Sequence, residues 1–378
     1  MRNLIRTLAL VGVAVATTAY AQKEQWLQYH TSRQGRGYRW LDLTTTPPPN
    51  VTLPKFKSKP YFAHWVSPLD QAGGRWVALD RSRSSGPFDK LYIDTKGDGK
   101  LDGPPVATWR SDQYSSYFEP AKVVFKGEDG PITYHLVVRG MQYEGEREPR
   151  ALASAGGFYS GLVDFGGKKK NIELIDANVN ATFNDMPFEA DRVQVEGDKV
   201  GERYIGKLLE VEGAFYSLQI ARDGAFIKVQ KQENVVLGKV RVPESLTQFV
   251  AWGENGQFYR KPLKGELTLP AGSYRAQEWT IDRKDRKGST WNMSGSFGDP
   301  VTFEVAEGKT APLEIGEPIH VEISTQGTTN VTGFNLSFVG RAGESIQLMM
   351  GSQRPPGPKL VLASLDGTYR VTNTFEFG

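Results

Sequence analysis

Cysteine is absent from the 378-residue chain. This absence excludes disulfide bonds, thiolate metal sites and a cysteine nucleophile. A protein that works outside the cytoplasm without disulfides must take its stability from a large core or from bound ions. Hydrophobic residues make up 39% of the chain, which is enough to build such a core.

Histidine is scarce, and the side chains that enzymes often use form no familiar pattern. The four histidines are His30, His64, His135 and His320, and no two of them have the spacing of metal ligands. The serine-hydrolase elbow, the zinc-protease helix motif and the phosphate-binding loop are missing as well. A composite site of two carboxylates stays open, because such acids need only meet in space.

Neither sign of charge dominates the sequence. The chain has 46 Lys and Arg against 43 Asp and Glu, and its formal net charge is +3. No arginine-rich or lysine-rich face is apparent in the pattern. We therefore expect no nucleic acid among its partners.

Long apolar runs are also rare. The one run of note, residues 8–16, follows two arginines and is too short to span a bilayer. Small residues precede Gln22, which predicts a signal peptide at residues 1–21 and cleavage between Ala21 and Gln22. The mature chain is then secreted or periplasmic and contains no transmembrane segment.

Turn-forming residues are abundant, with 41 glycines and 22 prolines. Short β-forming runs recur about every ten residues between these turns. No window keeps helical periodicity for three turns, and the best helical candidate, residues 148–155, is short. The pattern predicts an all-β fold of several β-sandwich domains with little helix.

Composition divides the mature chain into three parts. Residues 22–60 form an N-terminal arm and a proline-rich linker. Residues 61–238 form a β-domain with two Asp/Asn-rich loops. Residues 239–378 are predicted to form a β-sandwich region, for which the resemblance given below implies an immunoglobulin-like fold, with a further split possible near residue 316.

The two Asp/Asn-rich loops, residues 94–102 and 176–185, are the stretches with a chemical signature. Each loop follows a strand that ends in an apolar pair, and Asp94 aligns with Asp176. The loops are therefore interpreted as two units of one design, of which the second is eroded.

Calcium takes about six to eight oxygen ligands, and a loop can supply them from alternate positions. The predicted ligands are Asp94, Asp98, the Lys100 carbonyl and Asp102 in the first loop. In the second loop they are Asp176, Asn178, Asn180, the Thr182 carbonyl and Asn184. Lys96 and Pro105 occupy positions where further oxygens would stand, so the predicted Kd is weak, about 10⁻⁴–10⁻³ M. The alternative is a turn whose carboxylates bond their own backbone.

The first loop resembles the EF-hand-type calcium loops of dockerin repeats and of many secreted bacterial β-proteins. The turn at residues 270–274 is similar to turns of prealbumin-like domains. Together these motifs resemble uncharacterised secreted bacterial all-β proteins that combine such loops with immunoglobulin-like or prealbumin-like domains. The resemblance implies an architecture and no particular activity.

Three functions remain open at this point. The first is an exported, non-enzymatic protein with a structural or binding role at the cell envelope, stabilised by calcium. The second is a carbohydrate-binding or carbohydrate-active envelope protein that uses surface aromatics, with Trp65 and Trp76 as the first residues to test. The third is a hydrolase with a composite carboxylate site. The expected partners are a polysaccharide or another envelope protein.

Overall fold

A computed structural model describes residues 23–375, except residues 72, 84–85, 129, 144, 147, 188–190 and 329–330. Every regular element in this part of the chain is a strand, and there are 28 of them, which confirms the all-β prediction. The predicted signal peptide lies outside the described residues. The described part of the chain contains no helix with the length and apolarity needed to cross a membrane.

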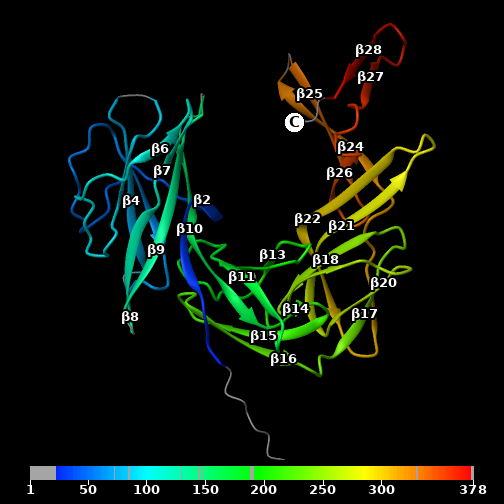
Figure 1. Cartoon of the computed structure of the whole chain (residues 1–378). Coiled ribbons are helices and arrows are strands. Elements are labelled where there is room, and N and C mark those ends of the chain that lie inside the picture. The colour runs from blue at the N-terminus through cyan, green and yellow to red at the C-terminus, as the bar shows by residue number, and fades with distance from the viewer. Residues whose placement is uncertain are drawn as a thin grey trace, which may run out of the picture.

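A nine-stranded antiparallel sheet organises the first half of the chain (Figure 1). Its main path runs β13 (Glu202–Tyr204), β12 (Arg192–Val195), β11 (Lys169–Ile175), β10 (Arg150–Asp164), β9 (Gly130–Met141), β7 (Ser115–Phe118) and β6 (Thr108–Ser111). Two more strands join off this path: β2 (Gln28–Leu41) pairs with β10, and β8 (Ala121–Gly127) pairs with β9.

Two smaller sheets share a hydrophobic core with one face of the nine-stranded sheet. One consists of β3 (Tyr61–Val66), β4 (Gly74–Asp80) and β5 (Lys90–Ile93). The other consists of β1 (Gln25–Trp26), β16 (Phe226–Gln232), β15 (Ala214–Ile220) and β14 (Leu209–Val211). The shared core includes Trp65, Tyr134 and Phe183, all with at most 1% of their surface exposed.

A second core begins at Val240 and is formed by the sheets of the C-terminal half. A seven-stranded sheet runs β19 (Gly256–Arg260), β18 (Gln248–Gly253), β21 (Gly272–Lys284), β22 (Thr290–Val305), β26 (Ser345–Met350), β25 (Val331–Val339) and β24 (His320–Thr328). A three-stranded sheet runs β20 (Glu266–Pro270), β17 (Leu237–Arg241) and β23 (Thr310–Pro312). The last hairpin consists of β27 (Lys359–Ala363) and β28 (Arg370–Thr374).

The helical candidate at residues 148–155 is wrong. From Arg150 onward this segment is the start of β10, and it pairs with β9 on one edge and with β2 on the other. Ala151, Ala153 and Ala155 alternate into the core, so burial in the sheet overrides the helix propensity of alanine. Residues 22–60 likewise contribute β1 and β2 to the sheets around the first core.

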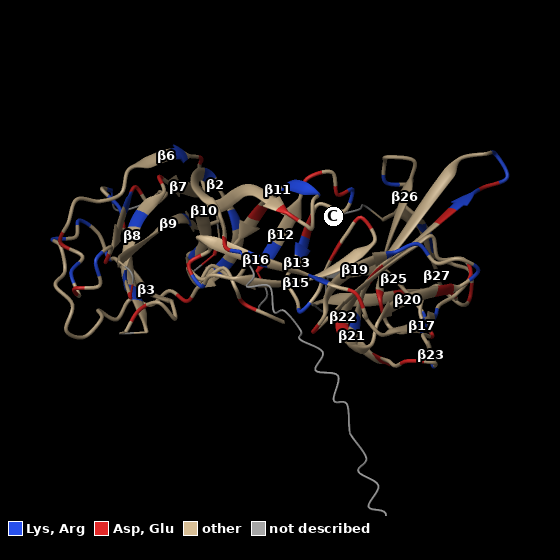
Figure 2. Cartoon of the chain, turned by 60° about the horizontal axis from the view of Figure 1, so that its bottom comes forward, with Lys and Arg blue, Asp and Glu red and all other residues tan. Residues whose placement is uncertain are grey.

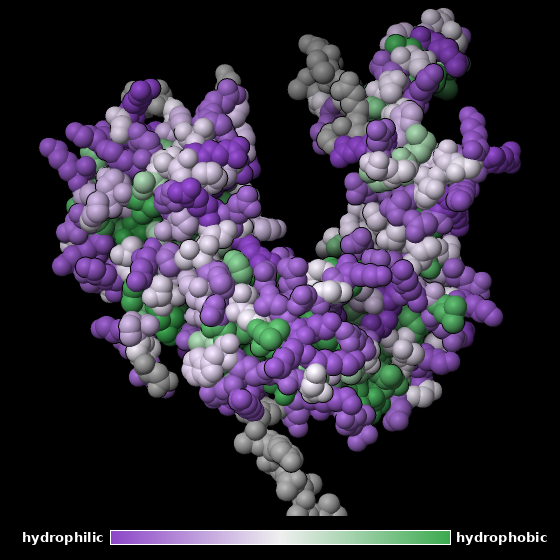
Figure 3. Space-filling model, in the orientation of Figure 1, coloured by the Kyte–Doolittle hydropathy of each residue, from purple (hydrophilic) through white to green (hydrophobic). Residues whose placement is uncertain are grey.

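The chain is U-shaped, with β2 to β10 in one arm and β21, β22 and β24 to β28 in the other (Figure 1). A space-filling view shows the open notch between the two arms (Figure 3). Because the first core lies on the opposite side of the nine-stranded sheet, the other face of that sheet lines the notch. We call it the notch face.

Backbone contacts at the base of the U join the two halves. The amide of Lys207 donates to the carbonyl of Glu254 (2.9 Å), and the next amide, that of Leu208, donates to Asn255 (3.1 Å). Leu208 also packs on the second core. The two halves are thus joined by main-chain hydrogen bonds as well as by side chains.

This junction predicts a sharp sensitivity at Gly206. A Cβ at this position would lie 2.1 Å from the backbone nitrogen of Gly256, so Gly206→Ala must push the two halves apart. We expect it to lower the free energy of unfolding by about 1–3 kcal/mol in urea titrations. The control is Gly298→Ala, where a Cβ meets nothing within 4 Å. Equal stabilities of the two variants would contradict the tight junction.

Candidate functional site

The first Asp-rich loop begins where β5 ends, and its leading carboxylate is turned inward. Asp94 is only 4% exposed. Its Oδ1 accepts the amides of Gly97 (2.7 Å) and Asp98 (3.2 Å), and its Oδ2 accepts the amide of Gly99 (2.9 Å). The loop is therefore folded around this one carboxylate, as in the hydrogen-bonded turn considered as the alternative to calcium.

A buried arginine lies against the same carboxylate. Arg75 on β4 forms an ion pair with Asp70, and its Nη1 lies 3.9 Å from Oδ1 of Asp94. Gly97 leaves room for it, because a Cβ there would lie 2.5 Å from Nη1 of Arg75. A protein cation thus already neutralises part of the charge of the loop.

The other predicted ligands of the first loop lie nearer to solvent. The side chain of Asp98 is 46% exposed and lies 3.9 Å from the ammonium of Lys100. Asp102 is exposed. Within the described residues, no group of three or more His, Cys, Asp or Glu side chains is placed to hold a metal ion. Calcium at Asp94, Asp98, Asp102 and the Lys100 carbonyl stays a prediction.

The calcium hypothesis and the hydrogen-bonded turn differ in a melting experiment. If calcium binds, about 5 mM calcium raises the melting temperature relative to EGTA, and Asp98→Ala abolishes this rise without removing the Asp94 acceptor. Asp94→Asn lowers the free energy of unfolding in both buffers by about 1–3 kcal/mol. The reason is that asparagine has one acceptor oxygen, whereas both oxygens of Asp94 accept backbone amides of the loop. Identical melting temperatures of the unmodified protein in the two buffers would count against a stabilising ion.

The second loop repeats the backbone of the first. Asp176 is fully buried, and its carboxylate accepts the amides of Asn180 (3.2 Å) and Ala181 (2.7 Å). Gly97 and Gly99 have φ of 71° and 72° in the first loop, and the equivalent Val179 and Ala181 have φ of 57° and 72°. Since non-glycine residues disfavour this region, the second loop holds strain that the first avoids.

Side chains stabilise the second loop from several directions. The hydroxyl of Tyr134 donates to Asp176 (2.8 Å), and the indole of Trp65 donates to the carbonyl of Val179 (2.6 Å). Three of the predicted calcium ligands form hydrogen bonds with another acid, Asp185. Oδ2 of Asp185 accepts hydrogen bonds from Asn178 (3.1 Å), Asn180 (2.7 Å) and the Thr182 hydroxyl (2.7 Å).

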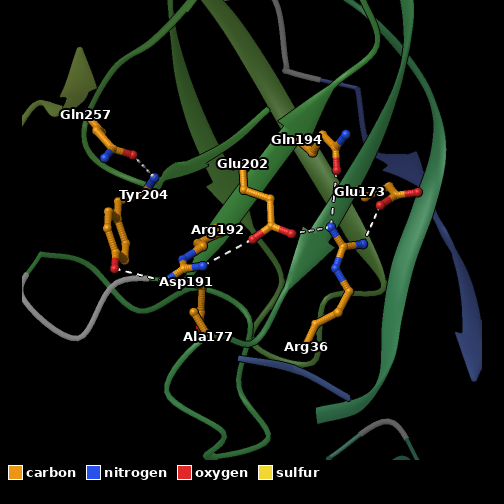
Figure 4. A network of polar contacts seen from close by, with 9 residues as sticks. All are labelled: Arg36, Glu173, Ala177, Asp191, Arg192, Gln194, Glu202, Tyr204 and Gln257. Atoms are coloured by element: carbon orange, nitrogen blue, oxygen red, sulfur yellow. Dashed lines mark hydrogen bonds and ion pairs between the residues drawn. The ribbon is translucent and has the colours of Figure 1, made fainter. Parts of the chain in front are cut away.

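Asn184 is exposed. Asp191 is buried beside the loop and lies near Ala177 (Figure 4), whose amide it accepts (3.1 Å). It also accepts the amide of Asp185 (2.9 Å). Burial, and next the charge of Asp176, raise the pKa of Asp191. Calcium at the second loop likewise stays a prediction.

The buried Asp176 predicts an unusual pH dependence. Burial raises its pKa from 3.8 to about 6, so the folded protein holds this proton more tightly than the unfolded chain does. Its contribution to stability therefore falls as pH rises from about 4 to about 6. Asp176→Asn removes this term, so the variant should gain stability relative to the unmodified protein over that range.

Urea titrations at pH 4, 5, 6 and 7 measure the difference. Asp42→Asn is the control, because it makes the same chemical change at an exposed position. A stability difference between Asp176→Asn and the unmodified protein that is constant with pH would refute the raised pKa.

The notch face carries a row of large side chains that sequence analysis did not identify. Directly paired residues of antiparallel strands share a face. The registers of β2, β10, β9, β7 and β6 therefore align Trp40, Leu152, Arg139, Tyr117 and Arg110. With strands about 4.8 Å apart, this upper row extends about 19 Å across the sheet.

A second, polar row crosses the same face nearer to the floor of the notch. The registers of β2, β10, β11, β12 and β13 align Gln28, Ser160, Glu173, Gln194 and Glu202. Arg36 belongs to β2 and lies at an irregularity in its pairing with β10. Its side chain lies over the lower row. Its guanidinium donates to Glu173, to Glu202 (2.7 Å) and to Gln194 (3.2 Å) (Figure 4).

The lower row continues toward the second half of the chain. Arg192 donates to Glu202 (3.2 Å) and to the hydroxyl of Tyr204 (3.0 Å). The ring of Tyr204 stacks on Trp252 with centroids 4.4 Å apart. Burial works against ionisation of Glu202, but hydrogen bonds from the two arginines hold its pKa below the usual value. The floor of the notch is thus a layer of paired polar groups.

Trp65 and Trp76, the tryptophans predicted for a sugar-binding surface, do not form one. Trp65 has no exposed surface, and Trp76 is partly buried beside His64 (4.9 Å between ring centroids). Trp40, which is 53% exposed, lies on the notch face instead. The alternation of side chains along its strand could have indicated from the sequence that Trp40 is exposed. The strand register that aligns Trp40 with the upper row cannot be predicted from the sequence.

A cleft of about 370 Å³ lies near the junction, lined by residues of both halves. Its acids are already engaged: Glu210 pairs with Arg260 (2.7 Å), Glu212 pairs with Lys170 (2.6 Å), and Asp198 pairs with Arg203. Glu196 accepts the amide of Asn171 (3.1 Å). This cleft does not offer the two unpaired acids that a composite hydrolase site requires.

Comparison with known proteins gives no match to a family model, to a curated protein or to a solved structure. The properties of the notch face therefore rest on its own residues.

Proposed function

We propose that the protein is a non-enzymatic binding protein of the cell envelope and that its notch face holds an extended polysaccharide. The upper row carries this proposal. It presents Trp40, Tyr117 and the stem of Leu152 on one face, in a line long enough for several sugar rings. The weakly positive C–H groups of a sugar pack well against the negative face of an aromatic ring.

Polar groups beside the aromatic residues suit the rest of a sugar. Sugar hydroxyls donate and accept hydrogen bonds, so they need partners of both kinds at the same surface. The notch face offers guanidinium donors in the upper row and amide and carboxylate groups in the lower row. The open notch gives a long polymer access from either side (Figure 3).

The fold suits a binding role because the platform is held rigidly. Ladders of hydrogen bonds fix the strands of the notch face, and the Arg36 cluster fixes side chains beneath the upper row. A rigid surface loses little conformational entropy when a ligand binds. The proposed location outside the cytoplasm rests on the predicted signal peptide.

Trp40→Ala tests the proposal. The purified protein is run in affinity gels that contain β-glucan, xylan, dextran or polygalacturonate. We expect retardation by at least one polymer, and a loss of about 10- to 100-fold in affinity for Trp40→Ala, because the most exposed aromatic ring of the upper row is removed.

Trp26→Ala is the matched control. Trp26 is 67% exposed but lies on β1, which pairs with β16 and has no residue in the upper row, so its removal should leave retardation unchanged. Retardation by none of the polymers, or equal losses for the two variants, would overturn the proposal.

A further inference from the structure

The upper row ends in an arrangement that suits a negatively charged ligand. Arg110 and Arg139 flank Tyr117, with their guanidinium carbons 5.2 Å and 4.8 Å from the centre of its ring. All three side chains lie on one face, because the registers pair Tyr117 with both arginines. The centroid of Trp109 lies 5.9 Å from that of Tyr117 and extends the aromatic surface.

The charges of these two arginines are poorly neutralised. Among the described residues, neither guanidinium forms an ion pair with an acid. Arg139 donates to the neutral hydroxyl of Ser115 (2.9 Å), and Arg110 has the ring of Tyr117 as its contact. Arg36 differs from both, because its guanidinium forms ion pairs with two carboxylates.

Asp112 is close enough for the charges of both arginines to act on its carboxyl, but its hydrogen bonds are made elsewhere. Oδ1 of Asp112 accepts the amides of Tyr114 (2.9 Å) and Ser115 (2.7 Å), and so closes the turn between β6 and β7. These hydrogen bonds are the main reason why the pKa of Asp112 lies below its usual value, and the charges of the two arginines lower it further. Asp112 therefore makes its hydrogen bonds with the turn and not with either guanidinium.

We infer that this end of the notch face, formed by Arg110, Tyr117 and Arg139, binds the anionic group of an acidic polysaccharide. A guanidinium offers a planar fork of donors that fits a carboxylate or a sulfate. An adjacent aromatic ring holds the sugar that carries the anion. Mixed charges elsewhere on the chain (Figure 2) make this a local feature of the notch face and not a general attraction to anions.

The inference rests on the proposed polysaccharide function and specifies the class of polymer. The test compares each acidic polymer with its uncharged counterpart: polygalacturonate with its methyl ester, and dextran sulfate with dextran. Affinity electrophoresis at low and at about 0.5 M salt gives the dissociation constants. We expect at least tenfold tighter binding of one acidic polymer than of its counterpart, and a loss of this preference in high salt.

Arg110→Gln and Arg139→Gln should each reduce the preference by about tenfold, because the acidic polymer loses a charge-assisted partner while the uncharged polymer loses only a neutral hydrogen bond. Arg110 is exposed, so its variant tests the charge without disturbing the core. Arg286→Gln, an equal charge change at an exposed turn between β21 and β22, should have no effect. The two acidic polymers distinguish a site for carboxylate from a site for sulfate.

Two results would overturn the inference. One is equal binding of acidic and uncharged polymers, which leaves the proposed function standing if Trp40→Ala still weakens binding. The other is an acidic preference that persists in both arginine variants, which places the anion elsewhere. Failure of every polymer to bind removes the proposed function together with the inference.

Discussion

The continuity of β10 is the constraint on which the notch face depends. This strand pairs with β2 along one edge, while its other edge pairs first with β9, up to Ala155, and then with β11, from Tyr159. Gly157 lies where the partner changes. A Cβ at this position would lie 2.0 Å from the hydroxyl oxygen of Tyr29, so only glycine leaves room for that hydroxyl. That hydroxyl accepts the amide of His135 (2.9 Å). One strand thereby carries both rows on a single face, and a break in it would separate the binding surface from its support.

The two Asp-rich loops stabilise the sheets behind this face. Each uses a buried carboxylate to collect the amides of a turn that the strand ladder cannot satisfy. The first loop balances its charge with Arg75 and uses glycine wherever φ is positive. The second has no ion pair of this kind at Asp176 among the described residues; it places Val179 and Ala181 in the disfavoured region and relies on Tyr134 and Trp65. The same turn is thus held by two different chemical means.

Local signals in the sequence were enough for the strands, the turns and the shared design of the loops, because these depend on alternation and on glycine positions. They were not enough for residues 150–155, where an alanine-rich segment forms a strand only because sheet neighbours bury it. Trp40 and Arg139 are about a hundred residues apart in the chain and meet across β10 only through register. Since register follows from tertiary pairing, a row across five strands leaves no mark in the order of residues.

The two rows divide the work of binding in a way that follows from their partners. In the lower row the charges of Arg36, Glu173 and Glu202 are already satisfied by one another, so further hydrogen bonds from a sugar to these groups add less to affinity. In the upper row Arg110 keeps its donors free of acids, and Trp40 keeps much of its ring in solvent. New contacts with a ligand therefore cost little there. Affinity should come from the upper row, and the lower row should fix the shape that makes this affinity specific.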